Sequence, residues 1–257
     1  MHRFFVEPTL LAGTPDTIML PDKLAHQVRD VLHLTIGERL VLLDNSGSEV
    51  VATVARSNRT GVEVQWVERR PGKRESSVRI ILCQGLLKSA RFEWILEKGT
   101  ELGVAVFVPT LCRRSLSGLE EAGPAKIARW QRIIQEAAEQ CGRSRLPELQ
   151  SIRLLARILD DIPTGTLALM PWEEEQRLSL RDALNVYQRN TLPSPTTVVL
   201  FIGPEGGLTA EEVVLAQQHG VQSVTLGPRI LRAETAALAA VANVMYALEN
   251  MPGNTEC

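Results

Sequence analysis

Hydrophobic and polar positions follow two different rhythms along this chain. Up to about residue 70, the apolar residues gather in three short segments, Arg39–Leu43, 50–54 and 62–67, which are rich in Val and Leu and typical of strands. A helical stretch over 23–34 interrupts this part, and the turn-prone run 44–47 suits a hairpin. These features predict a small mixed β-barrel.

A polar run over 71–77 has no apolar periodicity and indicates a linker. Beyond it, strand-like segments alternate with amphipathic helical ones. The predicted strands are 78–83, 104–108, 167–170, 198–202 and 224–226, and the predicted helices are Pro124–Cys141, Ala233–Glu249 and those that begin after Ser89 and Thr209. We expect Ser89 to cap its helix, Pro109 to end the second strand, and Thr209 and Glu212 to form a capping box. The alternation predicts an α/β segment with a parallel sheet covered on both faces.

The composition excludes several classes of protein. Of the 257 residues 44% are hydrophobic, and the formal net charge is −2, unlike that of disordered chains. Apolar runs such as 198–202 and 236–242 are far shorter than the about 20 residues that span a membrane. The N-terminal apolar stretch ends at Glu7, before the core of a signal peptide could form, so we expect a cytoplasmic protein that does not bind membranes.

The cysteines and histidines of the sequence do not have the spacing of metal ligands. The four cysteines form no CxxC pair, and no two histidines have helical spacing with an acid between them. We therefore predict no metal site. A Ser/His/Asp or Cys/His hydrolase is disfavoured because the motif G-x-S-x-G does not occur.

The small net charge hides an uneven distribution. Residues 73–150 carry 13 basic and 9 acidic side chains, whereas residues 151–257 carry 7 basic and 12 acidic ones. Near-neutrality therefore does not exclude RNA, because one basic face can supply all phosphate contacts. The candidate RNA-binding residues in the basic segment are Lys88, Arg91, Arg113, Arg143 and Arg145. Solvent-facing helix ends would explain the same residues equally well.

The most informative loop follows the strand 198–202 and reads Gly203-Pro204-Glu205-Gly206-Gly207. In open α/β sheets, ligands bind beyond the carboxyl ends of strands, and glycines let a ligand approach the main chain closely. The loop matches neither known nucleotide fingerprint, and its Glu would repel a polyphosphate. A cationic or zwitterionic ligand suits it better. A tight turn with glycines chosen for geometry is the alternative.

Two more loops have the same character. In 226–235, Ile230 and Leu231 could line a slot for adenine or could staple the loop onto the core, and in 170–175 the acids could line a pocket or merely be solvated. Because all three loops follow strands, we expect them to form one pocket.

Four ordered motifs resemble those of the RsmE family, the bacterial 16S ribosomal RNA methyltransferases of the SPOUT superfamily that make 3-methyluridine. These motifs are Lys98-Gly99-Thr100-Glu101-Leu102-Gly103-Val104, the run from Glu139 to Pro147, Ile202 to Gly207, and Leu226 to Ala236. The resemblance implies an N-terminal PUA-like β-barrel over 1–72 and a C-terminal SPOUT α/β domain over 73–257, with a deep trefoil knot at about 167–249. It also implies S-adenosylmethionine (SAM) as methyl donor, 16S rRNA of the small ribosomal subunit as substrate, and a homodimer with the active site near the dimer interface.

The resemblance further implies a site. The residues that would bind SAM are Met170, Pro171, Trp172, Ile202, Gly203, Glu205, Gly206, Gly207, Leu226, Gly227, Ile230, Leu231 and Thr235. Arg232 and Glu234 would be catalytic. We expect Arg232 to stabilise the uracil anion or to orient a carbonyl, and Glu234 or Glu205 to position neighbouring groups or to accept the N3 proton. The chain departs from the family at Phe4-Phe5, His33 and Ala233.

Two other functions stay open at this point. One is an enzyme of the same fold that acts on tRNA or on ribose 2′-hydroxyls. The other is an RNA-binding module without catalysis. The target nucleotide, and whether the acceptor is free RNA or an assembled subunit, also stay open.

Overall fold

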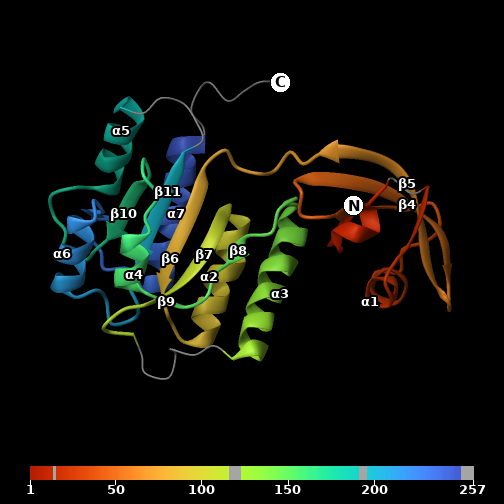
Figure 1. Cartoon of the computed structure of the whole chain (residues 1–257), viewed down its shortest axis with the longest axis horizontal. Coiled ribbons are helices and arrows are strands. Elements are labelled where there is room, and N and C mark those ends of the chain that lie inside the picture. Colours follow the sequence, from red (N-terminus) through yellow and green to blue (C-terminus); the bar gives the residue numbers. More distant parts are fainter. Residues whose placement is uncertain (14–15, 116–122, 191–195, 250–257) are drawn as a thin grey trace. The chain divides into compact units, whose positions relative to one another are not determined.

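The computed structural model describes residues 1–13, 16–115, 123–190 and 196–249, and the chain divides into two compact units (Figure 1). The first unit comprises residues 1–75 and 138–146, and the second comprises residues 76–137 and 147 onwards. The predicted boundary after residue 72 assigned 138–146 to the second segment. In the structure, this stretch belongs to the first unit.

The first unit is built on a five-stranded sheet with the order β1-β3-β4-β5-β2. β1 runs parallel to β3, and the other neighbours are antiparallel. Alternating Val and Leu residues of the central strands share one apolar core with Phe4, Leu11 and Val28. The strands are β1 (His2–Phe5), β2 (Thr17–Met19), β3 (Arg39–Leu43), β4 (Ser48–Asn58) and β5 (Gly61–Pro71).

The three strands predicted for this unit are present, although β4 and β5 extend well beyond their predicted ends. The predicted helix over 23–34 is too long. Helix α1 (Asp22–His26) continues as a π-helical turn, Gln27–Val31, and the helical stretch ends before His33, which adopts a left-handed φ of 53°. A short 3₁₀ helix, Pro8–Leu11, and the edge strands β1 and β2 had not been predicted, because each is too short to show a clear periodicity.

The second unit contains a parallel sheet with the order β12-β10-β11-β6-β7-β8, and β9 also pairs with β7. Within the described residues its strands all pair in parallel, as the strand–helix alternation predicted. Its strands are β6 (Arg79–Gly85), β7 (Val104–Leu111), β8 (Glu148–Leu149), β9 (Arg153–Leu154), β10 (Leu167–Pro171), β11 (Thr197–Ile202) and β12 (Gln222–Val224).

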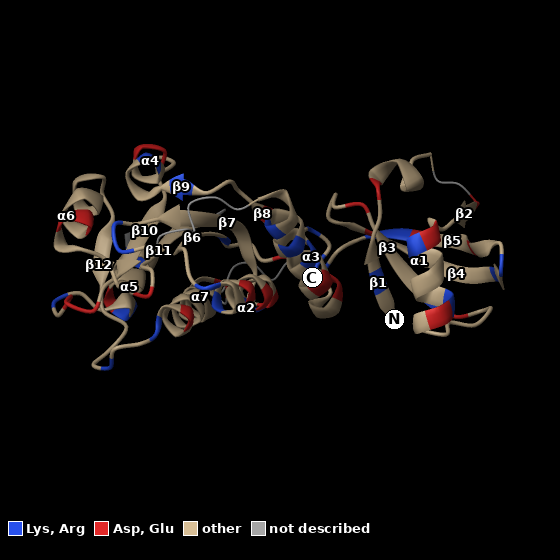
Figure 2. Ribbon diagram, turned by 90° about the horizontal axis from the view of Figure 1, so that it is seen from below, with Lys and Arg blue, Asp and Glu red and all other residues tan. Residues whose placement is uncertain are grey.

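Helices cover both faces of this sheet, which confirms the predicted layers (Figure 2). One face packs against α2 (Ser89–Glu101), α3 (Pro124–Cys141), α5 (Leu180–Asn190) and α7 (Ala233–Glu249). The other face packs against α4 (Leu155–Asp160) and α6 (Ala210–Gln218). Continuous apolar runs such as Val198–Leu200 on β11 contribute side chains to the cores on both faces of the sheet, because successive side chains point to opposite faces.

Three local predictions for this unit need correction. Lys88 rather than Ser89 precedes the first turn of α2, and the Ser89 hydroxyl donates to Glu93 instead. Pro109 does not end β7. It falls between the residues that pair with β8 and those that pair with β9, so its missing N–H breaks no pairing on that edge. β12 ends at Val224, two residues before the predicted end. The capping box of Thr209 and Glu212 is confirmed.

Residues 138–146 are joined to the rest of the first unit by hydrogen bonds to side chains. The Glu75 carboxylate accepts hydrogen bonds from the backbone N–H groups of Ser144 and Arg145 and from Nη2 of Arg143, the last at 3.0 Å. Asn45 Oδ1 accepts a further bond from the N–H of Leu146. One acidic side chain thus satisfies several donors of a segment that lies about seventy positions further along the chain.

A second acidic centre lies inside the same unit. Glu49 is only 4% exposed and accepts hydrogen bonds from Nη1 of Arg3 at 2.6 Å and from Nη2 of Arg70 at 3.1 Å. Burial disfavours the charged carboxylate, but the two guanidinium groups outweigh it and hold the pKa of Glu49 below its ordinary value of 4.5. The carboxylate therefore contributes stability above pH 4.5, and this contribution is lost as the pH falls through the lowered pKa.

We predict that Glu49→Gln lowers the free energy of unfolding of the first unit by about 2 kcal/mol at neutral pH, because it leaves charged donors without their anion. Urea unfolding of both proteins should show this difference shrinking as the pH is lowered below about 4.5. The control is Glu68→Gln, since Glu68 also pairs with Arg70 but its side chain is 54% exposed. A loss as large for Glu68 as for Glu49 would contradict the prediction.

Candidate functional site

The candidate site is built from loops at one edge of the second sheet. β10, β11 and β12 are parallel neighbours, so their carboxyl ends meet at the same edge. The loops that leave these ends are 172–179, 203–209 and 225–232, and they contain most of the residues predicted to bind SAM. Three predicted residues lie on the strands themselves: Met170 and Ile202 are buried, and Pro171 at the end of β10 is half-buried.

The 203–209 loop is closely packed at its glycines. The N–H of Gly207 donates to the carbonyl of Pro204 at 2.9 Å, and Gly207 has a φ of +72°. A side-chain carbon at Gly207 would lie 2.5 Å from Oε1 of Glu173, so this glycine lets two of the loops approach each other.

Arg114, in the turn that follows β7, holds the same loop. Its Nη1 donates to the carbonyls of Gly206 at 3.1 Å and Leu208 at 3.4 Å. The sequence carries no sign of this role, because the contact joins residues 92 positions apart.

The segment that follows β12 runs between two parts of the 172–179 excursion. On one edge, the N–H of Trp172 donates to the carbonyl of Val224 at 3.0 Å. On the other edge, the N–H of Thr225 donates to the carbonyl of Leu178 at 2.8 Å, and the N–H of Leu180 donates to the carbonyl of Thr225 at 3.0 Å. The chain from 171 to 180 therefore passes around Val224 and Thr225.

Glu175 helps to hold this excursion in place. Its carboxylate accepts hydrogen bonds from the Ser223 hydroxyl and from the N–H of Arg177, and these bonds lower the pKa of Glu175. Of the acidic run 173–175, this residue thus serves the fold, whereas Glu173 lines the pocket described next.

A pocket of about 100 Å³ lies between the ends of β10 and β12. Six of the residues predicted to bind SAM line it: Pro171, Trp172, Leu226, Gly227, Ile230 and Leu231. Its volume is below the roughly 300 Å³ at which ligand pockets usually begin, so it accommodates only part of such a ligand.

The residues of this pocket fit SAM chemically. Leu226, Ile230 and Leu231 offer apolar surface for an adenine ring, and Ile230 is 86% exposed. Nε1 of Trp172 is buried and finds no hydrogen-bond partner in the described part of the chain, so a donor is available to a ligand. Glu173 supplies negative charge, which suits a sulfonium or an ammonium group.

The two acids considered for proton transfer are joined by one arginine. Nη1 of Arg91 lies 2.9 Å from Oε1 of Glu205, and its Nε lies 3.7 Å from Oε1 of Glu234. Oε2 of Glu234 is buried and has no hydrogen-bond partner among the described residues. Arg232 and Thr235 are exposed at the start of α7, where the Arg232 carbonyl accepts the N–H of Ala236 at 2.8 Å.

The five candidate RNA-binding residues have different surroundings. Lys88, Arg113 and Arg145 are exposed, and Arg113 lies 3.6 Å from Glu211. Arg143 is 6% exposed and pairs with Glu75, so the prediction that it contacts RNA is not supported by its position. Arg91 is engaged by the two acids.

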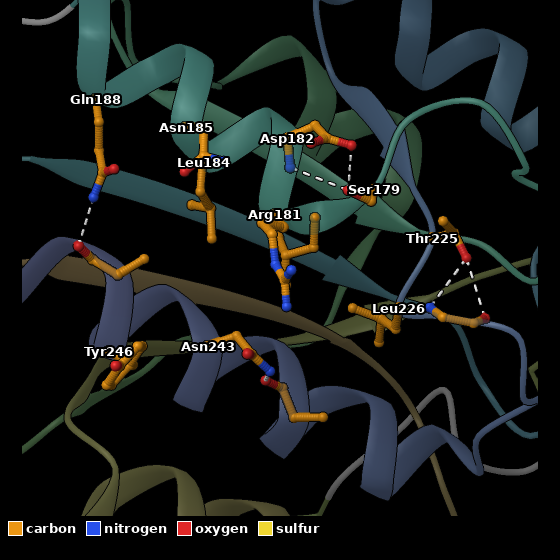
Figure 3. Close-up of a pocket in the computed structure, with 14 residues that line it drawn as sticks. Ser179, Arg181, Asp182, Leu184, Asn185, Gln188, Thr225, Leu226, Asn243 and Tyr246 are labelled. Atoms are coloured by element: carbon orange, nitrogen blue, oxygen red, sulfur yellow. Dashed lines mark hydrogen bonds between the residues drawn. The ribbon is translucent and has the colours of Figure 1, made fainter.

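Sequence reasoning missed a larger groove of about 1170 Å³ between α5 and α7. Arg181 and Leu184 point from α5 toward α7, and the groove reaches Thr225, Leu226 and Gly227, which also border the smaller pocket (Figure 3). Tyr246 on its rim is 79% exposed. The amphipathic pattern of 180–190 was the only available signal, and it does not say what the helix faces.

Other kinds of site are not found in the described part of the chain. No three His, Cys, Asp or Glu side chains there are placed to hold a metal ion. Among the described helices, none is long and apolar enough to cross a membrane. Cys83 and Cys112 are free thiols, and burial raises the pKa of Cys83 to about 12.

Comparison with known proteins agrees with this geometry. A family model described as RNA methyltransferase domain matches residues 74–245. The ribosomal RNA small subunit methyltransferase E of Bacillus subtilis is 30% identical over 258 residues, which cover 99% of this chain and 100% of that protein. The protein of the same name from Synechocystis is 34% identical over 97% of this chain and 78% of its own length.

A solved structure is similar over almost the whole chain. The ribosomal RNA small subunit methyltransferase E of Neisseria gonorrhoeae, crystallised bound to SAM, is 29% identical and superposes with a TM-score of 0.84. The match covers 98% of this chain and 100% of that one. Together with the family model and the full-length relatives, this likeness shows that the chain belongs to the ribosomal RNA small subunit methyltransferase E (RsmE) family.

Proposed function

We propose that this protein transfers the methyl group of SAM to N3 of a uridine in the 16S rRNA of the small ribosomal subunit, giving 3-methyluridine. The observation that carries the proposal is the pocket between the ends of β10 and β12, whose lining suits SAM, in a chain of the RsmE family. We expect the enzyme to act in the cytoplasm, where the small subunit is found.

In this proposal the loops divide the cofactor between them. Leu226, Ile230 and Leu231 would contact the adenine, and Trp172 would form a wall and donate its free N–H. Gly203, Gly206 and Gly207 would let the ribose and methionine part approach the main chain, with Glu205 beside it. Gly227 and Thr235 complete the candidate set.

Methyl transfer to uracil requires the N3 proton to be removed, because neutral N3–H is a poor nucleophile. Bound SAM supplies an electrophilic methyl carbon on a sulfonium. The N3 electron pair forms the new bond to that carbon, the bond from carbon to sulfur breaks, and its electron pair stays on sulfur. Arg232, exposed at the start of α7, would stabilise the negative charge that develops on the uracil ring.

Glu234 is the better placed of the two candidate proton acceptors. Its Oε2 lacks a partner although it is buried, whereas Oε1 of Glu205 is 2.9 Å from Arg91. A free carboxylate oxygen is available to accept a proton. The target base would have to leave its stack to reach this position, as other bases do that are modified by enzymes.

For the RNA, we propose that the first segment is a PUA-like barrel over about 1–72 that helps to hold the substrate. Exposed Arg145 in the first unit, and Lys88 and Arg113 in the second, are available for phosphate contacts. Arg143 would instead support the fold of the first unit through Glu75.

We also propose that the methyltransferase domain, over about 73–257, contains a deep trefoil knot at about 167–249. The hydrogen bonds on both edges of Val224 and Thr225 support this, because the chain from 171 to 180 passes around the segment that leads into α7.

The groove between α5 and α7 supports a homodimer. Its volume of about 1170 Å³ far exceeds the about 100 Å³ of the pocket between β10 and β12, and both are lined by Thr225, Leu226 and Gly227. A second copy seated there would lie next to the SAM site. The exposed Tyr246 ring offers an aromatic anchor of the kind that interfaces favour.

Two other functions are distinguished by one experiment. Unmodified small subunits, free 16S rRNA and tRNA transcripts are each incubated with labelled SAM and the protein, and the nucleosides are then analysed. An enzyme for tRNA or for ribose would label tRNA or give 2′-O-methyl nucleosides, and a module without catalysis would label nothing. We expect 3-methyluridine from rRNA.

We predict that Trp172→Phe weakens SAM binding about three- to tenfold, because one hydrogen bond from Nε1 is lost. Calorimetry with SAM measures this. Trp130→Phe is the matched control, since Nε1 of Trp130 is also buried without a partner but lies in the core beside Phe92. Equal SAM affinity in both variants and the parent protein would remove Trp172 from the cofactor site.

We predict that Arg232→Ala lowers methyl transfer to small subunits by roughly 100-fold or more, while SAM binding stays within about twofold, because its charge acts on the developing uracil anion. Arg132→Ala serves as control, since Arg132 is exposed on α3 and forms an ion pair with Glu136 of its own helix. Full turnover by the Arg232 variant would exclude Arg232 from the mechanism.

We predict that the protein sediments at twice its 28.4 kDa chain mass and that Tyr246→Glu shifts it toward the monomer, with a parallel loss of methyl transfer. Val214→Glu is the control, because Val214 is 52% exposed on α6, on the opposite face of the sheet. A parent protein that sediments as a monomer would refute the proposed dimer.

A further inference from the structure

Arg91 lies where three segments of the second unit meet. It is the third residue of α2, Glu205 lies in the 203–209 loop, and Glu234 is the second residue of α7. α2 and α7 pack against each other along the same face of the sheet. The Arg91 guanidinium therefore connects two helix starts to the loop that follows β11.

The connection is asymmetric. The contact of Arg91 with Glu205 is a hydrogen bond, with Nη1 2.9 Å from Oε1. The contact with Glu234 is a looser ion pair of 3.7 Å between Nε and Oε1. Arg91 thus fixes the loop directly, and the buried Oε2 of Glu234 has no hydrogen-bond donor among the described residues.

Arg91 provides the positive charge that balances the carboxylates of Glu205 and Glu234. Two carboxylates that share one arginine would repel each other without it, and their side chains are only 22% and 14% exposed to water. Among the described residues, no other basic side chain forms an ion pair with Glu205 or Glu234. Removing Arg91 would leave both anions without a counter-charge, and the 203–209 loop would lose its link to α2.

The same two carboxylates disfavour a contact between Arg91 and RNA. A phosphate that bound the Arg91 guanidinium would have to compete with both carboxylates, which already occupy its Nη1 and Nε. Lys88, one turn earlier and exposed, forms no ion pair within the described chain and is the better candidate for that contact.

We propose that Arg91 is a positioning residue of the methyltransferase site, which fixes the 203–209 loop through Glu205 and orients Glu234, and that it does not act by binding RNA. The inference rests on the proposed function, because it assigns the loop to SAM and Glu234 to the uracil. Positioning the site and contacting RNA would affect different steps. A positioning residue changes SAM binding in the absence of RNA, whereas an RNA contact does not.

The test compares the parent protein with Arg91→Gln, Arg91→Lys and Arg129→Gln. Arg129 is the matched control, because it pairs through Nε and Nη2 with Glu93 of the same helix α2 but touches neither loop acid. SAM affinity is measured by calorimetry without RNA, and kcat and KM for small subunits are measured with saturating SAM. Thermal unfolding checks that each variant is folded.

We expect Arg91→Gln to weaken SAM binding without RNA about tenfold and to lower kcat, with the KM for small subunits changed less than about threefold. Arg91→Lys should recover part of the SAM affinity, since it keeps the charge but cannot reach both acids as a planar fork does. Arg129→Gln should behave like the parent. Combining Arg91→Gln with Glu205→Gln should weaken SAM binding less than the sum of the single effects, because both remove the same contact.

Unchanged SAM affinity in Arg91→Gln, with or without a raised KM for small subunits, would overturn the positioning role and leave the proposed function intact. Failure of the parent protein to bind SAM or to methylate rRNA would instead refute the proposed function. If Arg91→Gln does not fold, Arg91→Lys decides: SAM affinity and kcat equal to those of the parent would overturn the proposal, and a loss of both would support it.

Discussion

The candidate site depends on the hydrogen bonding that places β10 between β11 and β12 in a parallel sheet. β12 follows β11 in the chain but pairs with β10, so the loops that leave all three strands become neighbours at one edge. Parallel pairing then aligns their carboxyl ends, where main-chain groups are available to a ligand. The bonds of Trp172 and Leu178 to the Val224–Thr225 segment hold this arrangement from both sides.

Acidic side chains are the second feature of this edge of the sheet. Glu205 and Glu234 come from different segments and share Arg91, and Glu173 lies against Gly207 of the glycine-rich loop. Such a concentration of negative charge is unfavourable unless cations balance it. Arg91 balances two of these acids, and Arg114 ties the glycine loop by its carbonyls rather than by charge. A cationic sulfonium would complete the balance when SAM is bound.

In the first unit, acidic residues instead bind arginines within the fold, with Glu49 buried and Glu75 half-buried. Glu49 is contacted by Arg3 and Arg70, and Glu75 by Arg143 and two backbone N–H groups. Arginines in these positions stabilise the fold and are not available to phosphates. The basic surplus of residues 73–150 is therefore larger than the basic charge that this segment presents to RNA.

The sequence by itself determined the elements and the chemistry of the loops. Periodicity located α3 and α7, the alternation of strands and helices implied a parallel sheet, and residue identity marked the loop at Gly203 to Gly207, because these signals are local. Tertiary structure decided which charges meet. Arg143 faces Glu75 from 68 positions away and Arg91 faces Glu205 from 114, and no local pattern records such a pairing. The groove between α5 and α7 was hidden for the same reason. An amphipathic helix has a face to bury, but its partner is chosen by the path of the whole chain.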